Sequence, residues 1–392
     1  MEALAAANAN FSLELFKKIT EITKAKNTGN VFYSPFSISS ALAMVSLGAR
    51  GNTEVQILEV SSQCTQFSEA MDSFTQGSRN LSVLVPEKYG LYSSDLTLIK
   101  PSFLVFFPPI LQKFLADTKT LYLAELEAVD FISNAEAARV KINKWVEKKT
   151  QEKIKDLLAK GDVDDETRLV LVNALYFKGD WEMKFYSDYT TEVQFKINKN
   201  ESKPVQMMHQ TATFPFTYVP DVDCQILELP YEGKDMSMLI MLPNNMEDNT
   251  TGLEKLEQML TYDKLVEWTR PDMMHTVEVQ VGLPRFKLEE TYDLKEILVS
   301  MGMVDAFSPK KCDFSGMAPC SNLVLSKVVQ KSFVEVTEEG TEAAAATAVT
   351  ATLITSSMPL IQKMFRADHP FLFFIRHNPT QSILFYGRYS SP

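Results

Sequence analysis

The chain has 392 residues, with 39 Lys and Arg against 50 Asp and Glu, a formal net charge of −11. This acidic balance argues against a general nucleic-acid-binding protein, because such a protein needs a basic face to displace the counterions of the phosphate backbone. Hydrophobic residues make up 45% and charged residues 23% of the chain, which is typical of a globular protein with a large core and excludes wholesale disorder.

The first half of the chain is dominated by helical patterns and the second half by strand patterns. Apolar periodicity predicts helices over residues 11–20, 37–47 and 135–160. A continuous apolar run over residues 169–177 is typical of a strand covered on both faces. Further strands are predicted over residues 205–208, 224–229, 237–242, 277–283, 323–329, 333–336, 371–376 and 383–389, with helices at 253–259 and 294–301. The interleaved elements without a linker predict one large mixed domain.

Cysteine usage and the N-terminal residues bear on the compartment. Four cysteines are spread along the chain without a Cys-x-x-Cys pair, which predicts free thiols and a cytoplasmic location. No basic segment precedes an apolar run at the N-terminus, so a cleaved signal peptide is not expected, and release to the extracellular space stays open by another route. No run of 18 uncharged apolar residues occurs, so we expect no membrane association.

The sequence offers no convincing catalytic or metal-binding motif. It contains neither a phosphate-binding Gly-rich loop, nor a Gly-x-Ser-x-Gly elbow, nor a His-Glu-x-x-His pair. The four histidines lie far apart in sequence, and an acidic cluster at residues 162–166 lacks the glycine of a calcium-binding loop, so it is interpreted as a solvated loop. We therefore expect a protein that is not an enzyme and that needs no metal or cofactor.

Residues 337–366 form the most unusual segment. They lie between strong strand patterns, whereas ordered connections usually span about five residues. If the segment is extended, the charged Glu342 lies on one face, and the other face presents only small uncharged residues, namely Thr341, Ala343, Ala345, Thr347, Val349 and Ala351. Such a segment could enter a sheet between two strands without burying a charge. On pattern alone, an Ala-rich helix or a flexible linker are the alternatives.

The motif Glu338-Glu-Gly-Thr-Glu-Ala-Ala-Ala-Ala-Thr-Ala348 resembles the hinge of the inhibitory serpins. Other serpin-like motifs follow in the family's order and cover most of the chain: Asn30-Val-Phe-Tyr-Ser-Pro-Phe-Ser-Ile38, Leu171-Val-Asn-Ala-Leu-Tyr-Phe-Lys-Gly-Asp-Trp181, Leu283-Pro-Arg-Phe286, Lys331-Ser-Phe-Val-Glu-Val336, Ala367-Asp-His-Pro-Phe-Leu-Phe-Phe-Ile-Arg376 and Phe385-Tyr-Gly-Arg388. The chain is similar to the ovalbumin-type (clade B) intracellular branch.

The resemblance implies an α+β fold in a single large domain, residues 1–392, with a central, mostly antiparallel sheet, further β-sheets, surrounding helices and an exposed reactive-centre loop at about residues 337–366. It also implies the function of a serine protease inhibitor that acts as a suicide substrate. The protease cleaves the loop, forms an acyl-enzyme and is trapped when the loop inserts into the central sheet. The expected partner is a target protease in a covalent complex. A monomer without nucleic-acid or membrane partners is expected.

The resemblance also assigns site residues by their positions in this chain. The hinge comprises Glu338, Gly340, Thr341, Glu342, Ala343, Ala344, Ala345 and Ala346. The shutter, beneath the sheet, comprises Ser34, Ser37, Asn173 and Gln330, the last at a position where the family usually has histidine. The breach, where insertion begins, comprises Lys178, Gly179 and Trp181. For shutter and breach residues, ordinary packing is the alternative interpretation.

Counting along the family pattern from Gly340 as the fifteenth residue before the scissile bond places cleavage at Ile354–Thr355. Because the loop is slightly long for this branch, Leu353, Ser357 and Met358 remain alternatives. The apolar residues at this bond suit elastase- or chymotrypsin-like serine proteases, with papain-like cysteine proteases as a further class.

Two features depart from the inhibitory interpretation or compete with it. Residues 79–109 are turn-rich and then hydrophobic, and they lack the Asn-Arg-Leu-Tyr type of strand expected there. The alternative function is that of a non-inhibitory serpin, a binding, chaperone or storage protein. Thr341 and the alanine run argue against this alternative, because non-inhibitory relatives often carry a large or charged residue in the hinge.

Overall fold

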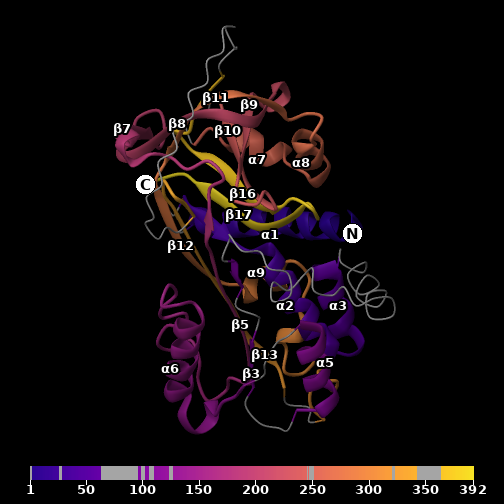
Figure 1. The fold of residues 1–392 in the computed structure, drawn as a ribbon. Helices are drawn as coiled ribbons and strands as arrows, with labels where there is room; N and C mark the ends of the chain where they lie inside the picture. Colours follow the sequence, from indigo (N-terminus) through magenta and orange to yellow (C-terminus); the bar gives the residue numbers. More distant parts are fainter. Residues whose placement is uncertain are drawn as a thin grey trace, which may run out of the picture.

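Two β-sheets organise the protein in the computed structural model, which describes residues 2–25, 29–62, 96–98, 102–105, 110–122, 127–244, 246, 251–319, 323–341 and 363–392. The first sheet has nine strands among these residues (Figure 1). Its order is β1 (Val31–Tyr33), β17 (Ser382–Tyr389), β16 (Phe371–His377), β10 (Met236–Pro243), β9 (Cys224–Pro230), β8 (Ser202–Val219), β11 (His275–Pro284) and β15 (Lys363–Arg366), with β7 (Thr191–Lys196) also paired to β8.

The second sheet, here called the central sheet, has eight strands among the described residues. Its order is β4 (Glu127–Ala128), β3 (Ser102–Val105), β5 (Leu169–Phe177), β13 (Leu325–Val336), β14 (Gly340–Thr341) and β6 (Gly179–Asp180), with β12 (Phe286–Asp293) paired to β13 and β2 (Leu96–Leu98) to β5. Most of these pairs are antiparallel, but β5 and β13 are parallel. The line along which β5 and β13 pair is called the seam.

The described helices are α1 (Glu2–Ala25), α2 (Pro35–Gly48), α3 (Gly51–Ser62), α5 (Gln112–Tyr122), α6 (Phe131–Lys149), α7 (Glu254–Met259), α8 (Tyr262–Thr269) and α9 (Lys295–Ser300), with 3₁₀ turns at η2 (Ser187–Tyr189), η3 (Pro220–Val222) and η4 (Asp305–Phe307). Helix α2 begins at Pro35 because the hydroxyl of Ser34 accepts a hydrogen bond from the amide of Ser37 at 3.2 Å. Its buried residues lie on every side, so α2 is a core helix beneath the seam.

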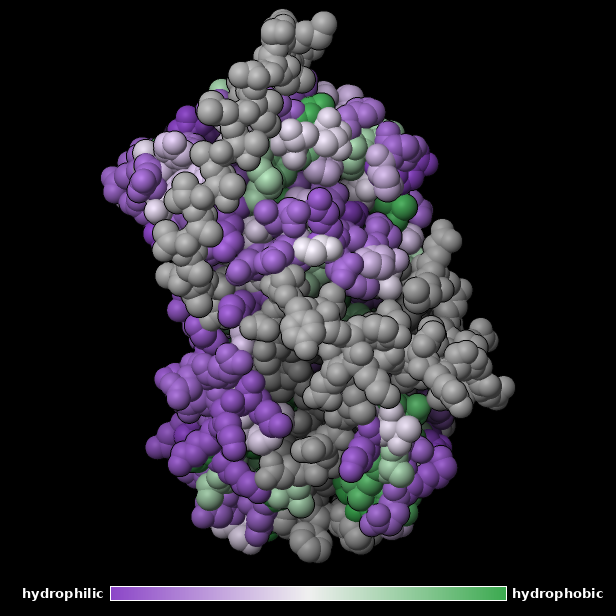
Figure 2. Space-filling view, viewed as in Figure 1, coloured by the Kyte–Doolittle hydropathy of each residue, from purple (hydrophilic) through white to green (hydrophobic). Residues whose placement is uncertain are grey.

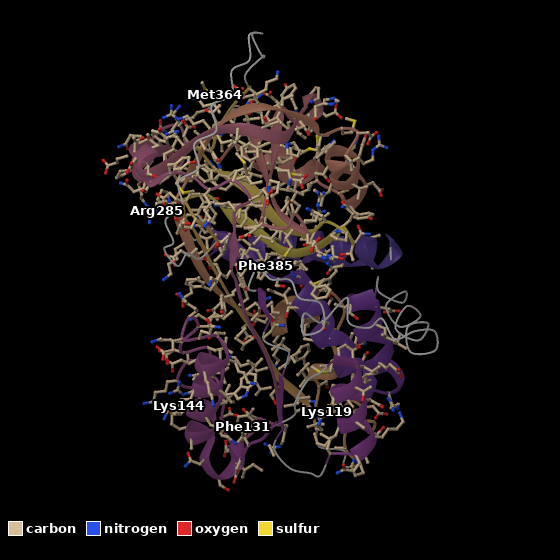
Figure 3. The ribbon with its side chains drawn as sticks, in the orientation of Figure 1. Lys119, Phe131, Lys144, Arg285, Met364 and Phe385 are labelled. Carbon is tan, nitrogen blue, oxygen red and sulfur yellow. The ribbon has the colours of Figure 1, made fainter. Side chains whose placement is uncertain are left out.

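Helix α6 covers the other face of the central sheet. Its buried residues Phe131, Ile142 and Val146 pack with Val172 of β5 and Val329 of β13. In Figure 3, Phe131 lies on the sheet side of α6, whereas Lys144 points outward, and Figure 2 shows the surface over this helix as mainly hydrophilic with a few hydrophobic residues. The lysines of α6 therefore form a solvated helix face.

The structure confirms the α+β class and most of the predicted elements, and it corrects two. The helix predicted over residues 135–160 is wrong beyond Lys149: Gln151, Glu152 and Asp156 have positive φ values, so the chain leaves the helix and continues as a strap over residues 150–168. The strands predicted at 323–329 and 333–336 are one strand, β13, because the charged Lys331 between them is paired rather than solvated.

The segment 79–109 lies outside the described residues except for β2 and β3. Both strands pair antiparallel with β5, so this segment contributes to the central sheet. None of the helices in the described ranges is long and apolar enough to cross a membrane.

Candidate functional site: the hinge and the seam

Strand β14 lies at the upper end of the seam, between β13 and β6. Thr341 is in register with Val336 of β13 on one side and with Gly179 of β6 on the other, and both pairings are antiparallel. The chain reverses sharply after β13, because the amide of Thr337 donates to the carbonyl of Gly340 at 2.8 Å. The first residues of the predicted hinge therefore already occupy the start of a strand position between the two halves of the central sheet.

Only glycine fits at position 340. Its φ of +155° is unusual for residues with a side chain, and a Cβ atom would stand 2.2 Å from the carbonyl oxygen of Gly179 and 2.6 Å from the Cα of Asp180. Gly179 is also constrained, since a Cβ there would lie 2.9 Å from the rings of both Phe177 and Tyr231. The two glycines allow the close approach of β14 to β6.

Trp181 fixes the turn between β13 and β14. Its main-chain amide donates to the carbonyl of Glu339 at 2.9 Å, and its indole Nε1 donates to the carbonyl of Thr337 at 3.0 Å. The indole stacks on Tyr231 with ring centroids 4.6 Å apart, and the Tyr231 hydroxyl shares a hydrogen bond of 2.9 Å with the hydroxyl of Thr341. The predicted breach residues Gly179 and Trp181 thus contact the hinge directly, and Lys178 lies half-buried beside them.

The two glutamates of the turn are paired. The carboxylate of the buried Glu338 accepts from the Thr190 hydroxyl at 2.6 Å and forms an ion pair with Arg285 at 3.2 Å. Glu339 pairs with Lys184 at 2.8 Å, and the hydrogen bond that Lys184 donates to Glu339 raises the pKa of Lys184. These contacts hold residues 338 and 339 in the turn, so the part of the loop that is free to be drawn in begins at β14.

The four predicted shutter residues meet beneath the middle of the seam. Asn173 of β5 is in register with Gln330 of β13. Asn173 donates to the Ser37 hydroxyl at 2.6 Å, and Gln330 donates to the main-chain carbonyl of Ser34 at 3.1 Å. The contact between the Gln330 amide and the Asn173 side-chain oxygen spans 3.4 Å, so the bond across the seam is weak.

Two buried polar groups beside this cluster lack partners. The side-chain oxygen of Gln330 and the hydroxyl of Ser332 have no hydrogen-bond partner among the described residues. Leaving a buried polar group unsatisfied costs about 1–3 kcal/mol. The polar layer along the seam is therefore incompletely hydrogen-bonded. We infer that β5 and β13 separate more easily than they would if a well-packed apolar layer lay in the same position.

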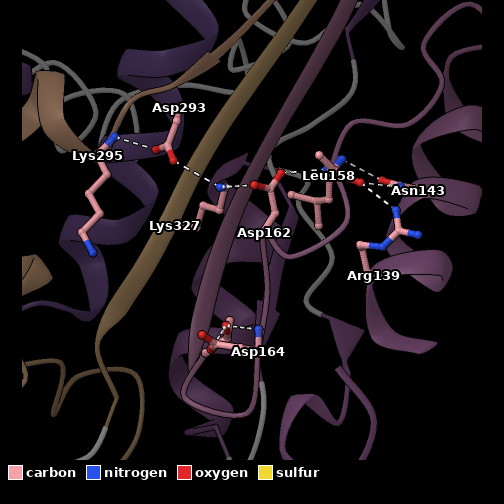
Figure 4. Close-up of polar contacts among 10 residues, drawn as sticks. Arg139, Asn143, Leu158, Asp162, Asp164, Asp293, Lys295 and Lys327 are labelled. Carbon is pink, nitrogen blue, oxygen red and sulfur yellow. Dashed lines mark hydrogen bonds and ion pairs between the residues drawn. The ribbon is translucent and has the colours of Figure 1, made fainter. Parts of the chain in front are cut away.

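On the α6 face of the sheet, two lysines of β13 hold the strap. Lys327 bridges Asp162 of the strap at 2.7 Å and Asp293 of β12 at 3.2 Å (Figure 4). Burial lowers the pKa of Lys327, but the hydrogen bonds that it donates to these two carboxylates, together with their charges, outweigh burial and hold the pKa above its ordinary value. Lys331 donates to the carbonyl of Lys155 at 2.8 Å and pairs with Glu289 at 2.7 Å.

Sequence reasoning missed these two lysines and treated Asp162 as part of a solvated loop. A signal was present, because two lysines four residues apart interrupt an otherwise apolar strand and lie on one of its faces. The partners were beyond reach, since Lys155 was predicted to lie in a helix and Asp162 in a solvated loop.

The remaining predicted site residues lie outside the described part of the chain. They are the hinge residues Glu342, Ala343, Ala344, Ala345 and Ala346 and the candidates for the cleaved bond, Leu353, Ile354, Thr355, Ser357 and Met358. Within the described ranges, no group of three or more His, Cys, Asp or Glu side chains is placed to hold a metal ion.

Comparisons with known proteins agree on one family. The family model described as "Serpin (serine protease inhibitor)" matches residues 6–392. Leukocyte elastase inhibitor of Sus scrofa is 50% identical over 401 residues and that of Homo sapiens 47% identical over 397 residues, with 100% of both chains covered in each case. The structure of uncleaved ovalbumin has a TM-score of 0.85 at 35% identity, covering 99% of this chain and 100% of that one. A structure of maspin has a TM-score of 0.86 at 34% identity, covering 100% and 99%.

Proposed function

Because this chain belongs to the serpin family, we propose that it inhibits serine proteases as a suicide substrate, by cleavage of its loop and insertion of that loop into the seam. The observation that carries the proposal is the position of β14. Its two residues already pair antiparallel with β13 and β6 at one end of the parallel β5–β13 pair. A strand continuing from Thr341 would run down between β5 and β13 and be antiparallel to both.

The covalent chemistry belongs to the protease. Its serine oxygen attacks the carbonyl carbon of Ile354, the Ile354–Thr355 amide bond breaks, and the nitrogen of Thr355 leaves as a new amino group that takes up the proton. An ester now joins Ile354 to the protease serine. Water would complete hydrolysis of this ester, so inhibition requires that the loop inserts before deacylation. The small uncharged face of residues 341–351 suits rapid insertion.

The energy released by insertion is sufficient for the trap. Insertion breaks one ladder of eight register pairs along the seam and creates two new antiparallel ladders. About ten additional backbone hydrogen bonds, at a net ~0.5–1.5 kcal/mol each, contribute on the order of 10 kcal/mol. Loss of one oxyanion-hole donor costs a protease about 3–4 kcal/mol. The gain therefore exceeds the resistance of a protease whose active site is distorted as it is displaced.

The target class follows from the residues at the bond. Leu353 and Ile354 are apolar, which suits elastase- or chymotrypsin-like serine proteases rather than trypsin-like ones; papain-like cysteine proteases accept Leu353 as well. The leukocyte elastase inhibitors, to which the chain is about half identical, are named for an elastase. We assign elastase-like proteases as the first class to test.

The decisive experiment mixes the protein with leukocyte elastase and analyses the products by denaturing gel and mass spectrometry. Inhibition predicts an SDS-stable complex between elastase and residues 1–354, together with a separate 38-residue fragment (392 − 354 = 38) that begins at Thr355 and is already cut off when the ester forms. A fragment that begins elsewhere would reassign the bond to one of the alternatives. Complete turnover without a complex would contradict inhibition and favour a binding or storage role.

We also propose that the protein acts as a monomer in the cytoplasm. Cys224 and Cys312 are free thiols, and burial raises the pKa of both, so neither is a reactive thiolate at neutral pH. Free thiols at both of the described cysteines suit a reducing compartment. Release into the extracellular space, where elastase-like proteases act, remains compatible with this chemistry.

A further inference from the structure

The connection between β6 and β7 exposes an apolar group at the surface. Met183, Tyr186 and Tyr189 are 48%, 51% and 61% exposed, and the two tyrosine rings contact each other edge to face with centroids 6.0 Å apart. None of the three residues of η2 is buried. Large apolar side chains that cluster at the surface often mark an interface, whereas single exposed ones do not.

This connection lies where the reactive-centre loop leaves the central sheet. The amide of Phe185 donates to the carbonyl of Glu338 at 2.9 Å, and the hydroxyl of Thr190 donates to the carboxylate of Glu338 at 2.6 Å. The two tyrosines lie within this short stretch, at residues 186 and 189. They therefore lie next to the turn between β13 and β14.

The loop returns at β15, whose exposed face continues the same surface. His209 of β8, Gly282 of β11 and Arg366 of β15 lie in one row across three neighbouring strands. A Cβ at Gly282 would stand 3.5 Å from the His209 ring and 3.4 Å from Cγ of Arg366, and Nε2 of His209 lies 3.2 Å from the hydroxyl of Thr191. The row therefore runs without a break from the end of the tyrosine-bearing connection to β15.

Met364 is the most exposed large apolar residue of the described chain, at 64%, and it follows the first residue of β15. It alternates with the buried Phe365, so it lies on the same face as Arg366. Figure 3 places it at the pole of the molecule where Figure 1 shows β11. The turn that leads into β14 thus lies against the tyrosine-bearing connection, and Lys363, the other described end of the loop, directly precedes Met364.

We propose that Tyr186, Tyr189 and Met364, together called the rim, form a second contact with the target protease, in addition to the loop itself. The inference rests on the proposed function. A protease that holds the loop in its active site must approach between the two points where the loop joins the body, and these are the points that the rim occupies. Tyrosine and methionine are enriched in the cores of protein interfaces, and tyrosine is enriched among the residues that dominate their affinity.

Two cations near the rim are paired within the chain. Lys184 pairs with Glu339 and Asp180, and Arg366 with Asp368. Burial, together with the charge of Arg366, lowers the pKa of His209, so the imidazole is neutral at neutral pH. The rim therefore presents apolar side chains to an apolar patch next to the protease active site.

The test compares wild type with the double variant Tyr186→Ala/Tyr189→Ala and with Met364→Ala. The control is Tyr218→Ala: Tyr218 is 46% exposed and lies nine residues from His209 along β8, about 30 Å of strand. Two experiments use leukocyte elastase and give three quantities. One gives the dissociation constant for elastase whose nucleophilic serine is replaced by alanine, and the other gives the second-order rate constant and the stoichiometry of inhibition by the active enzyme.

The double variant is expected to weaken binding of the inactive elastase about tenfold and to slow inhibition by the same factor, with unchanged stoichiometry, whereas the control stays within about twofold of wild type. The proposed rim contact would be overturned if the dissociation constant of the double variant were unchanged, or if its slower inhibition were explained by a higher stoichiometry. If the wild-type protein binds inactive elastase but forms no covalent complex with the active enzyme, the proposed inhibition is refuted. The dissociation constants of the variants then still decide whether the rim contacts the protease. Absence of any wild-type binding would overturn both.

Discussion

The hydroxyl groups of Tyr231 and Thr341 lie 2.9 Å apart in a site where both side chains are fully buried. Burial raises the pKa of Tyr231, so the phenol stays protonated and can serve as donor or acceptor. The bond ties the second residue of β14 to the aromatic cluster of Trp181, Tyr231 and Phe177. The start of the hinge, up to Thr341, is therefore docked in the core before any protease arrives, at the end of the seam that the loop would have to open.

Replacement of Thr341 by arginine is expected to convert the protein from an inhibitor into a substrate. The site is fully buried and offers only a phenol and main-chain groups, so an arginine there is an uncompensated buried charge. Elastase should cleave the Thr341→Arg variant with at least a tenfold loss of SDS-stable complex, as quantified on gels. Thr341→Ser, which keeps the hydroxyl, is the control and should retain the complex.

Replacement of Gly340 by alanine is expected to destabilise the native form by about 1–3 kcal/mol, because the new Cβ would collide with the main chain of Gly179 and neither strand can yield alone. Urea unfolding of the uncleaved protein measures the change. Gly282→Ala is the matched control: the same substitution in a strand meets only side-chain atoms at 3.4–3.5 Å. An equal loss of unfolding free energy in the two variants would argue that β14 is not closely packed on β6.

Removal of the Lys327 side chain is expected to accelerate insertion. The strap packs on both β5 and β13 through Ile154 and Leu158, so parting of the seam must disturb it. Lys327 holds the strap through Asp162, and in Lys327→Ala that ion pair is lost. A synthetic peptide with the sequence of residues 341–352 should then incorporate several-fold faster, as followed by the rise in thermal stability. Lys144→Ala, on the exposed face of α6, should leave the rate unchanged.

We expect the folding stability of the protein to depend on pH through Glu290. It lies on the inward face of β12 beside Leu288 and Tyr292, in register with Ser332, and burial together with the charge of Glu289 raises its pKa from 4.5 to about 7. Between these two values the folded protein binds more protons than the unfolded chain, so this group lowers stability as pH rises and its full penalty is present above pH 7. The penalty is no more than about 3 kcal/mol, reduced by partial exposure.

Glu290→Gln removes this penalty. The variant should be more stable than wild type at pH 8, and the advantage should shrink as pH falls toward 4.5. Denaturant titrations at pH 5 and pH 8 measure the difference. Glu296→Gln, an exposed carboxyl on α9, is the control and should show no such trend. An advantage that is the same at both pH values would contradict the assignment.

Local patterns predicted much of the fold correctly. The apolar run of β5 is buried along its whole length, as expected for a strand covered on both faces, and Ser34 caps α2 as the Ser-Pro pair suggests. The error at the end of α6 had a physical cause. Ile154, Leu157 and Leu158 are buried at spacings compatible with a helix, but three residues with positive φ place them in an irregular strap instead.

The small uncharged face of the loop followed from the alternation of its residues, which is a local pattern, whereas the hinge glycine and the shutter residues followed from the serpin resemblance. The contacts that bring these residues together in one site depend on the tertiary structure. Asn173 and Gln330 are 157 residues apart, and Lys327 and Asp162 are 165 apart. Pairings over such distances depend on strand order and register, which no short stretch of sequence encodes, and the same holds for the surface that joins Tyr189 to Met364.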